Sequence, residues 1–247
     1  MLPSAPPAAL EFALSVECFY QALMETAAPA KEPELGGRLF YAGEVDGAGR
    51  ALLVAANIAG CASLAATSDA MAQKQAIRDG VADFLVNSLD EALRILKNEV
   101  RKRETVAVCM AAAPETVEQE MQERGVIPDL LRKNALRGFS EGVLWWRVDS
   151  APAQWLPKLD AMAMQCLGEG ADFEIRLARR WLRQAPRYLG RLAHGWRVLR
   201  CDADVAKGFI ARVESAAKSG EIAVGVEAGF SGSDEVMRVG SISRNDG

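Results

Sequence analysis

The spacing of apolar residues changes repeatedly along the chain, and each change predicts a new element of secondary structure. In residues 8–27 the apolar positions recur every three or four residues, as they do on one face of a helix. The apolar residues of this face are Phe12, Val16, Phe19 and Leu23. Residues 28–36 contain proline and glycine and are expected to form a linker. A regular alternation of short apolar runs and amphipathic stretches begins at residue 37 and lasts to residue 131.

The apolar runs in this alternating segment are too short for helices, so they predict strands. The predicted strands are 39–42, 63–67, 81–86, 105–110 and 126–131, and the predicted helices are 50–60, 69–79, 88–103 and 115–123. Ser88-Leu89-Asp90-Glu91 has the pattern of a capping box that begins the third helix. Apolar strands that alternate with helices are typical of a parallel sheet buried on both faces. The predicted fold class is therefore α/β, with a Rossmann-like, mostly parallel sheet and helices on both faces.

The pattern is less regular beyond residue 135. Strands are predicted at 143–148, 196–200 and 222–226, and helices at 151–167, 173–192 and 203–218. This α-rich extension either packs on the same sheet or forms a small subdomain. The last residues are rich in glycine and serine and are expected to be a flexible tail. The predicted organisation is 1–36 (helix and linker), 37–135 (Rossmann-like domain), 136–229 (extension) and 230–247 (tail).

Charge and cysteine content narrow the classes of protein without identifying one. The formal net charge of −4 does not predict binding to nucleic acid. The five cysteines include no CxxC pair, which argues against a disulfide framework and against a structural zinc site. His194 is the only histidine, so no metal site is expected and this residue is interpreted as a surface or structural one. The odd, scattered cysteines favour a reduced, cytoplasmic protein. No basic signal segment and no membrane-length apolar run is present, so neither a signal peptide nor a membrane segment is expected.

Glycines follow the first predicted strand, where a Rossmann-like sheet binds phosphate groups. Gly43, Gly47 and Gly49 could let backbone N–H groups approach a diphosphate at the start of a helix, or could simply close a tight turn. Thr67 and Asp69 follow the second predicted strand. A carboxylate at this place can hold ribose hydroxyls, although an Asp here more often caps the next helix. These segments predict no catalytic residue.

Five blocks of this region occur together in the order and spacing of a known domain. The blocks are Gly37-Arg38-Leu39-Phe40-Tyr41-Ala42-Gly43, Gly47-Ala48-Gly49, Ala59-Gly60-Cys61-Ala62-Ser63-Leu64, Ser88-Leu89-Asp90-Glu91-Ala92-Leu93 and Arg124-Gly125-Val126-Ile127-Pro128-Asp129-Leu130-Leu131. They resemble the NAD-binding, Rossmann-like domain of urocanase (urocanate hydratase). The resemblance implies a fold that holds NAD, which in that family is a tightly bound electrophile and not a hydride carrier.

The chain departs from this family in the phosphate loop. The family runs roughly GxGGMGGAQ where this chain reads EVDGAGRAL, so Glu44 and Asp46 stand in place of glycines. A carboxylate repels a diphosphate by about 1 kcal/mol at 4 Å in water and by more where both are partly buried. Arg50 is expected to offset part of this repulsion.

Two further departures concern the ribose and the substrate. Thr67 stands where the family carries an acidic residue for the ribose, and Asp69 could substitute for it. Arg132-Lys133-Asn134-Ala135-Leu136-Arg137 replace a TSAHDP-type segment that lines the family's active site. Urocanases are also much longer than this chain. Activity as a urocanate hydratase is therefore not expected.

A basic stretch lies in the extension. Residues 176–200 contain eight arginines and no acidic residue. Five of them share one stripe of the predicted helix: Arg176, Arg180, Arg183, Arg187 and Arg191. The stripe could be solvated or paired with acids elsewhere, could bind an acidic protein partner, or could bind nucleic acid, which is the least favoured of the three.

Three hypotheses for function follow from these patterns. In the first, the chain is a stand-alone urocanase-like Rossmann protein without hydratase activity that binds NAD or another nucleotide weakly at the glycine turn, Arg50, Thr67 and Asp69. In the second, it is an interaction or regulatory scaffold that uses the arginine stripe. In the third, it is an enzyme with new chemistry at the carboxyl ends of the strands. Assembly into a homo-oligomer is compatible with each of them.

Overall fold

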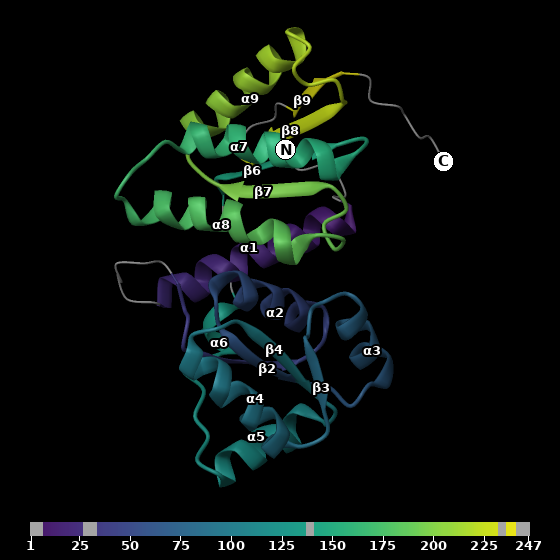
Figure 1. The fold of residues 1–247 in the computed structure, drawn as a ribbon, viewed down its shortest axis with the longest axis vertical. Coiled ribbons are helices and arrows are strands. Elements are labelled where there is room, and N and C mark those ends of the chain that lie inside the picture. The colour runs from purple at the N-terminus through teal and green to yellow at the C-terminus, as the bar shows by residue number, and fades with distance from the viewer. Residues whose placement is uncertain (1–6, 27–33, 137–140, 232–235, 241–247) are drawn as a thin grey trace. The chain divides into compact units, whose positions relative to one another are not determined.

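The computed structural model describes residues 7–26, 34–136, 141–231 and 236–240. The chain divides into two compact units, and the division falls within the first helix, α1 (Ala8–Thr26), which the sequence predicted. Ser15–Gly138 is called the Rossmann unit here, and Met1–Leu14 together with Phe139–Gly247 is called the C-terminal unit. Apart from α1, the Rossmann unit is blue to teal in Figure 1 and the C-terminal unit is green to yellow.

The Rossmann unit contains a five-stranded parallel sheet, which confirms the predicted α/β fold class. Its strands are β1 (Leu39–Glu44), β2 (Ala62–Ala66), β3 (Phe84–Val86), β4 (Val106–Met110) and β5 (Leu130–Leu131), in the order β3-β4-β2-β1-β5. The helices that join them are α2 (Gly47–Ala59), α3 (Ala70–Arg78), α4 (Leu89–Lys102) and α5 (Pro114–Glu123), and α6 (Arg132–Ala135) follows β5. The third and fifth strands are much shorter than the sequence predicted.

Local capping sets where the helices begin. Ser88 accepts a hydrogen bond from the N–H of Glu91 at 3.3 Å and begins α4, as its capping pattern predicted. The helix after β1 was predicted to begin at Arg50, and this was wrong, because it begins at Gly47. The reason is that Asp46 caps this helix and places the glycines that follow it in the first helical turn.

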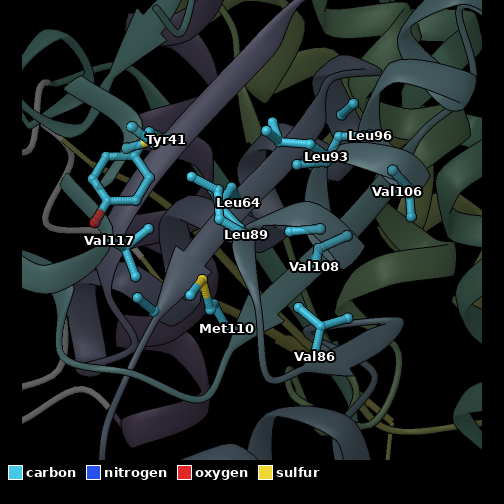
Figure 2. Packing of buried hydrophobic residues seen from close by; sticks show 14 residues of the cluster. Tyr41, Leu64, Val86, Leu89, Leu93, Leu96, Val106, Val108, Met110 and Val117 are labelled. Carbon is cyan, nitrogen blue, oxygen red and sulfur yellow. The ribbon is translucent and has the colours of Figure 1, made fainter. Parts of the chain in front are cut away.

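The two faces of the parallel sheet are covered by different helices. Tyr41, Leu64 and Val108 point into a core that α4 and α5 complete, and Figure 2 shows this cluster. Phe40 is fully buried outside this cluster, and α2 packs on β1 and β2. Right-handed crossovers place α3 on the same face as α2. The chain therefore leaves the neighbouring strands β2 and β4 toward opposite faces, and the crevice where such sheets bind ligands lies between their carboxyl ends.

The C-terminal unit contains a separate antiparallel sheet. Its strands are β6 (Val143–Val148), β7 (Trp196–Arg200), β8 (Val226–Phe230) and β9 (Val236–Val239), in the order β7-β6-β8-β9, and its further helices are α7 (Pro152–Leu167), α8 (Phe173–Leu189) and α9 (Ala203–Lys218). The ring centroid of Trp145 lies 5.5 Å from that of Trp196, and the centroid of Trp146 lies 4.9 Å from that of Phe209. Both residues of the Trp145–Trp146 pair are buried, which confirms that β6 is covered on both faces.

The end of the chain differs from the sequence prediction. The last strand was predicted at 222–226, but β8 only begins at Val226. Residues 230–247 were predicted to be a flexible tail, yet residues 236–239 form β9, and 241–247 lie outside the described residues. Gly229 lies within β8, and a Cβ there would come within 2.6 Å of the Trp145 ring. This glycine makes room for an aromatic ring in a strand and does not mark a loop.

Candidate nucleotide site

The turn between β1 and α2 has the close geometry of a phosphate-binding loop. A Cβ on Gly49 would lie 1.8 Å from the carbonyl oxygen of Glu44, so only glycine allows α2 to begin this close to the end of β1. Gly43 has a φ of +70°, a conformation that glycine adopts without strain. A Cβ on Gly47 would meet no heavy atom within 4 Å, so this glycine is not required for packing. Of the three predicted glycines, Gly43 and Gly49 therefore close the turn.

The chain's own carboxylate occupies the start of α2. The Oδ1 atom of Asp46 accepts the backbone N–H of Gly49 at 2.7 Å. Backbone N–H groups at the first turn of a helix have no partner within the helix, and they are the groups that hold a phosphate in Rossmann-like folds. At the N–H of Gly49, Asp46 therefore takes the position that a phosphate oxygen would need.

Arg132 fixes this carboxylate in place. Its Nη2 atom donates to both carboxylate oxygens of Asp46, at 3.0 and 2.8 Å. Its Nη1 atom donates to the carbonyl oxygens of Glu44 at 3.0 Å and of Ala42 at 3.4 Å. A Cβ on Gly43 would lie 3.4 Å from the Cδ of Arg132, so the arginine side chain lies along the glycine turn. One guanidinium thus ties the segment after β5 to the end of β1 and to the cap of α2.

The pKa of Asp46 reflects these contacts. Partial burial by itself would raise the pKa of this carboxyl group, but the hydrogen bonds from Arg132 and from the N–H of Gly49 outweigh that effect. The pKa is held below its ordinary value, so Asp46 stays ionised at neutral pH. The anion at the helix start is therefore a permanent one that belongs to the chain.

The other residues predicted to bind a cofactor are engaged elsewhere. Arg50 forms its ion pair with Asp79, the C-cap residue of α3, and not with Glu44 or Asp46. Asp69 caps α3 by accepting the N–H of Met71 at 2.8 Å, which confirms the helix-cap interpretation of this residue. Thr67 is buried, and its hydroxyl oxygen accepts the N–H of Asp69 at 3.2 Å.

Carboxylates act on two buried groups near the carboxyl end of β1, on which Arg132 also lies. The pKa of Tyr41 is raised, first by burial and then by the carboxylates of Glu118, Glu115 and Glu44. Burial raises the pKa of the Cys109 thiol to about 11, and the charge of Glu44 adds to this. Because carboxylates at this edge disfavour the ionised forms of both groups, they also disfavour a phosphate there.

The carboxyl ends of β2 and β4 are tied together at the crevice. The N–H of Thr67 donates to the carbonyl oxygen of Met110 at 3.1 Å, and the Tyr41 hydroxyl donates to the carbonyl oxygen of Pro114 at 3.3 Å. A hollow of about 780 Å³ is present in this unit, but it is lined by residues of β3, β4 and α4, among them Phe84, Ile95 and Val106. It lies beside the edge strand and not over the glycine turn. The turn is the better candidate for the ancestral site, because it lies at the carboxyl edge of the sheet and has the close glycine geometry of a phosphate-binding loop.

The predicted partner-binding arginines lie on and just after α8. Arg176 and Arg180 are half-buried, whereas Arg183, Arg187 and Arg191 are exposed, and Arg191 lies beyond the end of the helix. The guanidinium of Arg187 lies 5.3 Å from the centroid of the Tyr188 ring. His194 is exposed.

Neither a membrane span nor a cluster of metal ligands is found among the described residues. No helix in the described part of the chain has the length and apolar character to cross a membrane. Within residues 7–26, 34–136, 141–231 and 236–240, no three His, Cys, Asp or Glu side chains gather as metal ligands would.

The prediction from sequence missed Arg132, the residue that pairs with the Asp46 cap of α2. It appeared only as part of a segment that departs from the urocanase pattern. Its position directly after β5, the neighbour of β1, was a signal that could have found it, since parallel strands end at the same edge. The sequence order alone did not reveal that β5 pairs with β1.

Residues in three of the motif blocks form contacts that hold the fold together. Arg124 forms ion pairs with Asp90 of the capping-box block and with Glu120. The carboxylate of Asp129 accepts the N–H of Leu39 at 2.8 Å and pairs with Arg38 at 3.0 Å, which fixes the start of β1. These contacts join segments that are far apart in the sequence and so help to fix the architecture of the domain.

A comparison with protein families agrees with this architecture. Residues 16–135 match the family model described as the urocanase Rossmann-like domain. The match begins earlier than the resemblance found at Gly37, so it also includes the second half of α1. The match covers a little under half of the chain and supports a urocanase-family nucleotide-binding fold for this region.

Proposed function

Because residues 16–135 match the urocanase Rossmann-like domain, we propose that this unit is a nucleotide-binding fold whose diphosphate site is closed by the chain's own Asp46 and Arg132. In this proposal the protein binds NAD only weakly and does not hydrate urocanate. The observation that carries it is the Asp46 carboxylate, which accepts the N–H of Gly49 and is fixed by Arg132.

The groups present do not fit the diphosphate of NAD in this arrangement. A phosphate at the start of α2 would have to displace Asp46 from the Gly49 N–H, or lie beside it. Two like charges 4 Å apart repel by about 1 kcal/mol in water and by about 4 kcal/mol at the effective dielectric constant of a protein surface. Arg50 cannot offset this where it lies, because it pairs with Asp79. Each effect weakens the binding of NAD.

The test of this proposal replaces Asp46 with glycine, the residue that the urocanase family carries at this position. In Asp46→Gly the carboxylate is gone, the helix keeps an acceptable N-cap residue, and Arg132 becomes available to an anion. We expect isothermal titration calorimetry to give NAD affinity at least about tenfold higher for this variant than for the unaltered protein.

Asp202→Gly is the matched control, since it removes the N-cap carboxylate of α9, in the other unit, by the same substitution. Its NAD affinity should equal that of the unaltered protein. Tight NAD binding by the unaltered protein, with no gain in Asp46→Gly, would overturn the proposal. The loss of ultraviolet absorbance by urocanate measures hydratase activity directly, and turnover by the unaltered protein would contradict the second part of the proposal.

The exposed end of α8 supports a second candidate function, which is binding of an acidic protein. Arg183 and Arg187 are exposed and form no ion pair with any residue in the described part of the chain. They follow each other at i and i+4, so both charges face the same direction. An affinity capture that recovers the same partner with Arg183→Glu/Arg187→Glu as with the unaltered chain would contradict this function.

A further inference from the structure

The hollow of about 780 Å³ in the Rossmann unit lies where two neighbouring strands begin. Phe84 is the first residue of β3 and Val106 is the first residue of β4, which runs parallel to it. Ile95 of α4 supplies the third apolar side chain of the lining. The hollow therefore lies at the amino edge of the sheet, and its volume is in the range of sites that bind small molecules.

The apolar part of this lining is partly open to water. Val106 is 4% exposed and belongs to the core, whereas the aromatic side chain of Phe84 is 48% exposed. An apolar group that entered the hollow could pack on the Phe84 ring and remove this surface from water, which favours binding.

Two opposite charges of the lining have no counter-charge within the described part of the chain. Arg94 is exposed, and its guanidinium forms no ion pair with another described residue. The Asp83 carboxylate accepts the backbone N–H of Ala107 through Oδ2 at 2.8 Å, and this neutral donor leaves its charge unbalanced. Asp83 and Arg94 do not pair with each other, so both charges are available to a molecule in the hollow.

The other carboxylate of the lining is already balanced. Glu99 accepts hydrogen bonds from the Nζ atom of Lys102 at 2.9 Å and from the Nδ2 atom of Asn98 at 2.6 Å. The hydrogen bond from Lys102 is the largest effect that lowers the pKa of Glu99, so this group is both ionised and paired. The charge that remains unbalanced is one positive group at Arg94 and one negative group at Asp83.

We propose that this hollow binds a small zwitterion with an apolar ring, a class that includes the aromatic α-amino acids. Arg94 donates to the carboxylate of such a ligand, since a guanidinium matches the two oxygens of a carboxylate. The Oδ1 atom of Asp83 accepts from the ammonium group, and the ring packs on Phe84. A ligand with a single charge matches only one of the two groups, so the lining selects a ligand that carries both.

This inference is independent of the proposed function. The hollow lies at the amino edge of the sheet, whereas the glycine turn lies at the carboxyl end of β1. A protein that binds no NAD can bind a zwitterion in the hollow, and a protein that binds NAD can leave the hollow empty. Titrations with NAD and with a zwitterion therefore test the two proposals separately.

The test titrates the full chain with four probes and follows its amide signals by nuclear magnetic resonance. L-phenylalanine has both charges and a ring, 3-phenylpropionate lacks the ammonium group, phenethylamine lacks the carboxylate, and L-alanine lacks the ring. We expect L-phenylalanine to shift the signals of residues 83–84, 94–99 and 105–106 and to bind at least about tenfold more tightly than each other probe. No shift at these residues would overturn the site, and equal binding of any other probe would overturn the proposed selection.

Two variants remove the charges one at a time. Arg94→Gln removes the positive charge, and Asp83→Asn removes the negative charge but keeps an oxygen that can accept the N–H of Ala107. Each should bind L-phenylalanine at least about tenfold more weakly, with unchanged circular dichroism. Lys97→Gln and Glu104→Gln are the matched controls, because these exposed residues lie close in sequence to the lining but are not part of it. Losses as large in the controls would overturn the roles of Arg94 and Asp83.

Two neighbouring residues of β3 test the place of the ring. Phe84 and Leu85 are exposed to similar extents, 48% and 42%, but only Phe84 lines the hollow. Phe84→Ala should weaken the binding of L-phenylalanine by about fivefold, whereas Leu85→Ala should leave it unchanged. Equal affinities in the two variants would overturn the contact between the ligand and the Phe84 ring.

Discussion

Each unit of the molecule contains an Asp–Arg ion pair, and the two pairs differ in how far water reaches them. In the Rossmann unit, the Asp46 side chain is 49% exposed at the rim of the sheet and pairs with Arg132 at 2.8 Å. In the C-terminal unit, the Asp160 side chain of α7 is 13% exposed and accepts the Nε–H of Arg197 on β7 at 3.2 Å. The same two residue types therefore form one pair at a surface and one inside a core.

The two carboxyl groups respond in opposite directions. The pKa of Asp46 is lowered, because hydrogen bonds to the ionised form outweigh its partial burial. The pKa of Asp160 is raised to about 6, because burial outweighs the charge and hydrogen bond of Arg197. The Trp146 indole also favours the ionised form of Asp160, although its Nε1 makes no hydrogen bond of normal geometry. An opposite charge therefore lowers a carboxyl pKa only where the ion pair stabilises the ionised form by more than desolvation destabilises it.

The sign of each contribution to stability follows from these shifts. The folded state holds the Asp160 proton more tightly than the unfolded state, so this group favours folding most below pH 3.8, and that contribution is lost as pH rises to about 6. Asp46 behaves in the opposite way, since its contribution is present above pH 3.8 and is lost as pH falls through its lowered pKa. At neutral pH the rim pair stabilises the fold, while the ionised core carboxylate costs free energy.

The largest expected effect comes from removing the buried partner. Arg197→Ala leaves the Asp160 carboxylate buried without its counter-charge, and such a change destabilises by about 3–5 kcal/mol at neutral pH. All five tryptophans lie between residues 145 and 196, so urea unfolding followed by tryptophan fluorescence reports on the C-terminal unit. Arg132→Ala, followed by circular dichroism, should cost only about 1 kcal/mol. Equal losses in the two variants would contradict the difference between the pairs.

Neutralising the buried carboxyl group should have the next largest effect, with the opposite sign. Asp160→Asn resembles the protonated acid in shape, and a pKa of about 6 against the ordinary 3.8 corresponds to a gain on the order of 3 kcal/mol at pH 8. The gain should vanish at pH 4, where the unaltered Asp160 is itself protonated. Urea titrations of both proteins at the two pH values measure it, and a loss of stability at pH 8 would show that the ion pair stabilises the core.

Two glycines of the rim test whether the turn or the ion pair holds the site closed. Gly49→Ala forces a Cβ to within 1.8 Å of the Glu44 carbonyl oxygen, and overpacking of this kind costs about 1–3 kcal/mol. Gly47→Ala meets nothing within 4 Å and lies in the first turn of α2, so it should be neutral or stabilise by up to about 1 kcal/mol. Thermal unfolding followed by circular dichroism compares them. A cost for Gly47→Ala equal to that for Gly49→Ala would mean that the closeness of helix and strand is not what requires glycine.

The two ion pairs also mark what a single sequence can and cannot predict. The α/β fold, most helices and the caps at Ser88 and Asp69 followed from periodicity and local hydrogen-bonding chemistry, because those forces act within a few residues. Both ion pairs escaped prediction, since Asp46 and Arg132 are 86 positions apart in the chain and meet only because β5 lies beside β1. Strand order depends on packing between distant segments, which local patterns do not encode.

The same limit explains why the contact predicted for Arg50 differs from the one in the structure. Sequence correctly located the turn between β1 and α2, and it predicted that acids at positions 44 and 46 disfavour a diphosphate. It assigned Arg50 to offset them, whereas Arg50 pairs with Asp79, the residue that ends α3. Which arginine meets which carboxylate depends on how helices lie on the sheet, and the spacing of charges along the chain does not reveal it.

The smallest expected effect separates the charge of Asp46 from the space that it occupies. Asp46→Asn keeps an N-cap of similar strength and an oxygen that can accept the Gly49 N–H, but it removes the negative charge and weakens the contact with Arg132. Stability should fall by less than about 1 kcal/mol, because an exposed ion pair contributes little. The NAD affinity, measured by calorimetry, should rise only about threefold and stay below that of Asp46→Gly, since a side chain still fills the start of α2. If the two variants bind NAD equally well, repulsion alone closes the site; if Asp46→Asn binds no better than the unaltered protein, occupancy of the Gly49 N–H is what excludes the diphosphate.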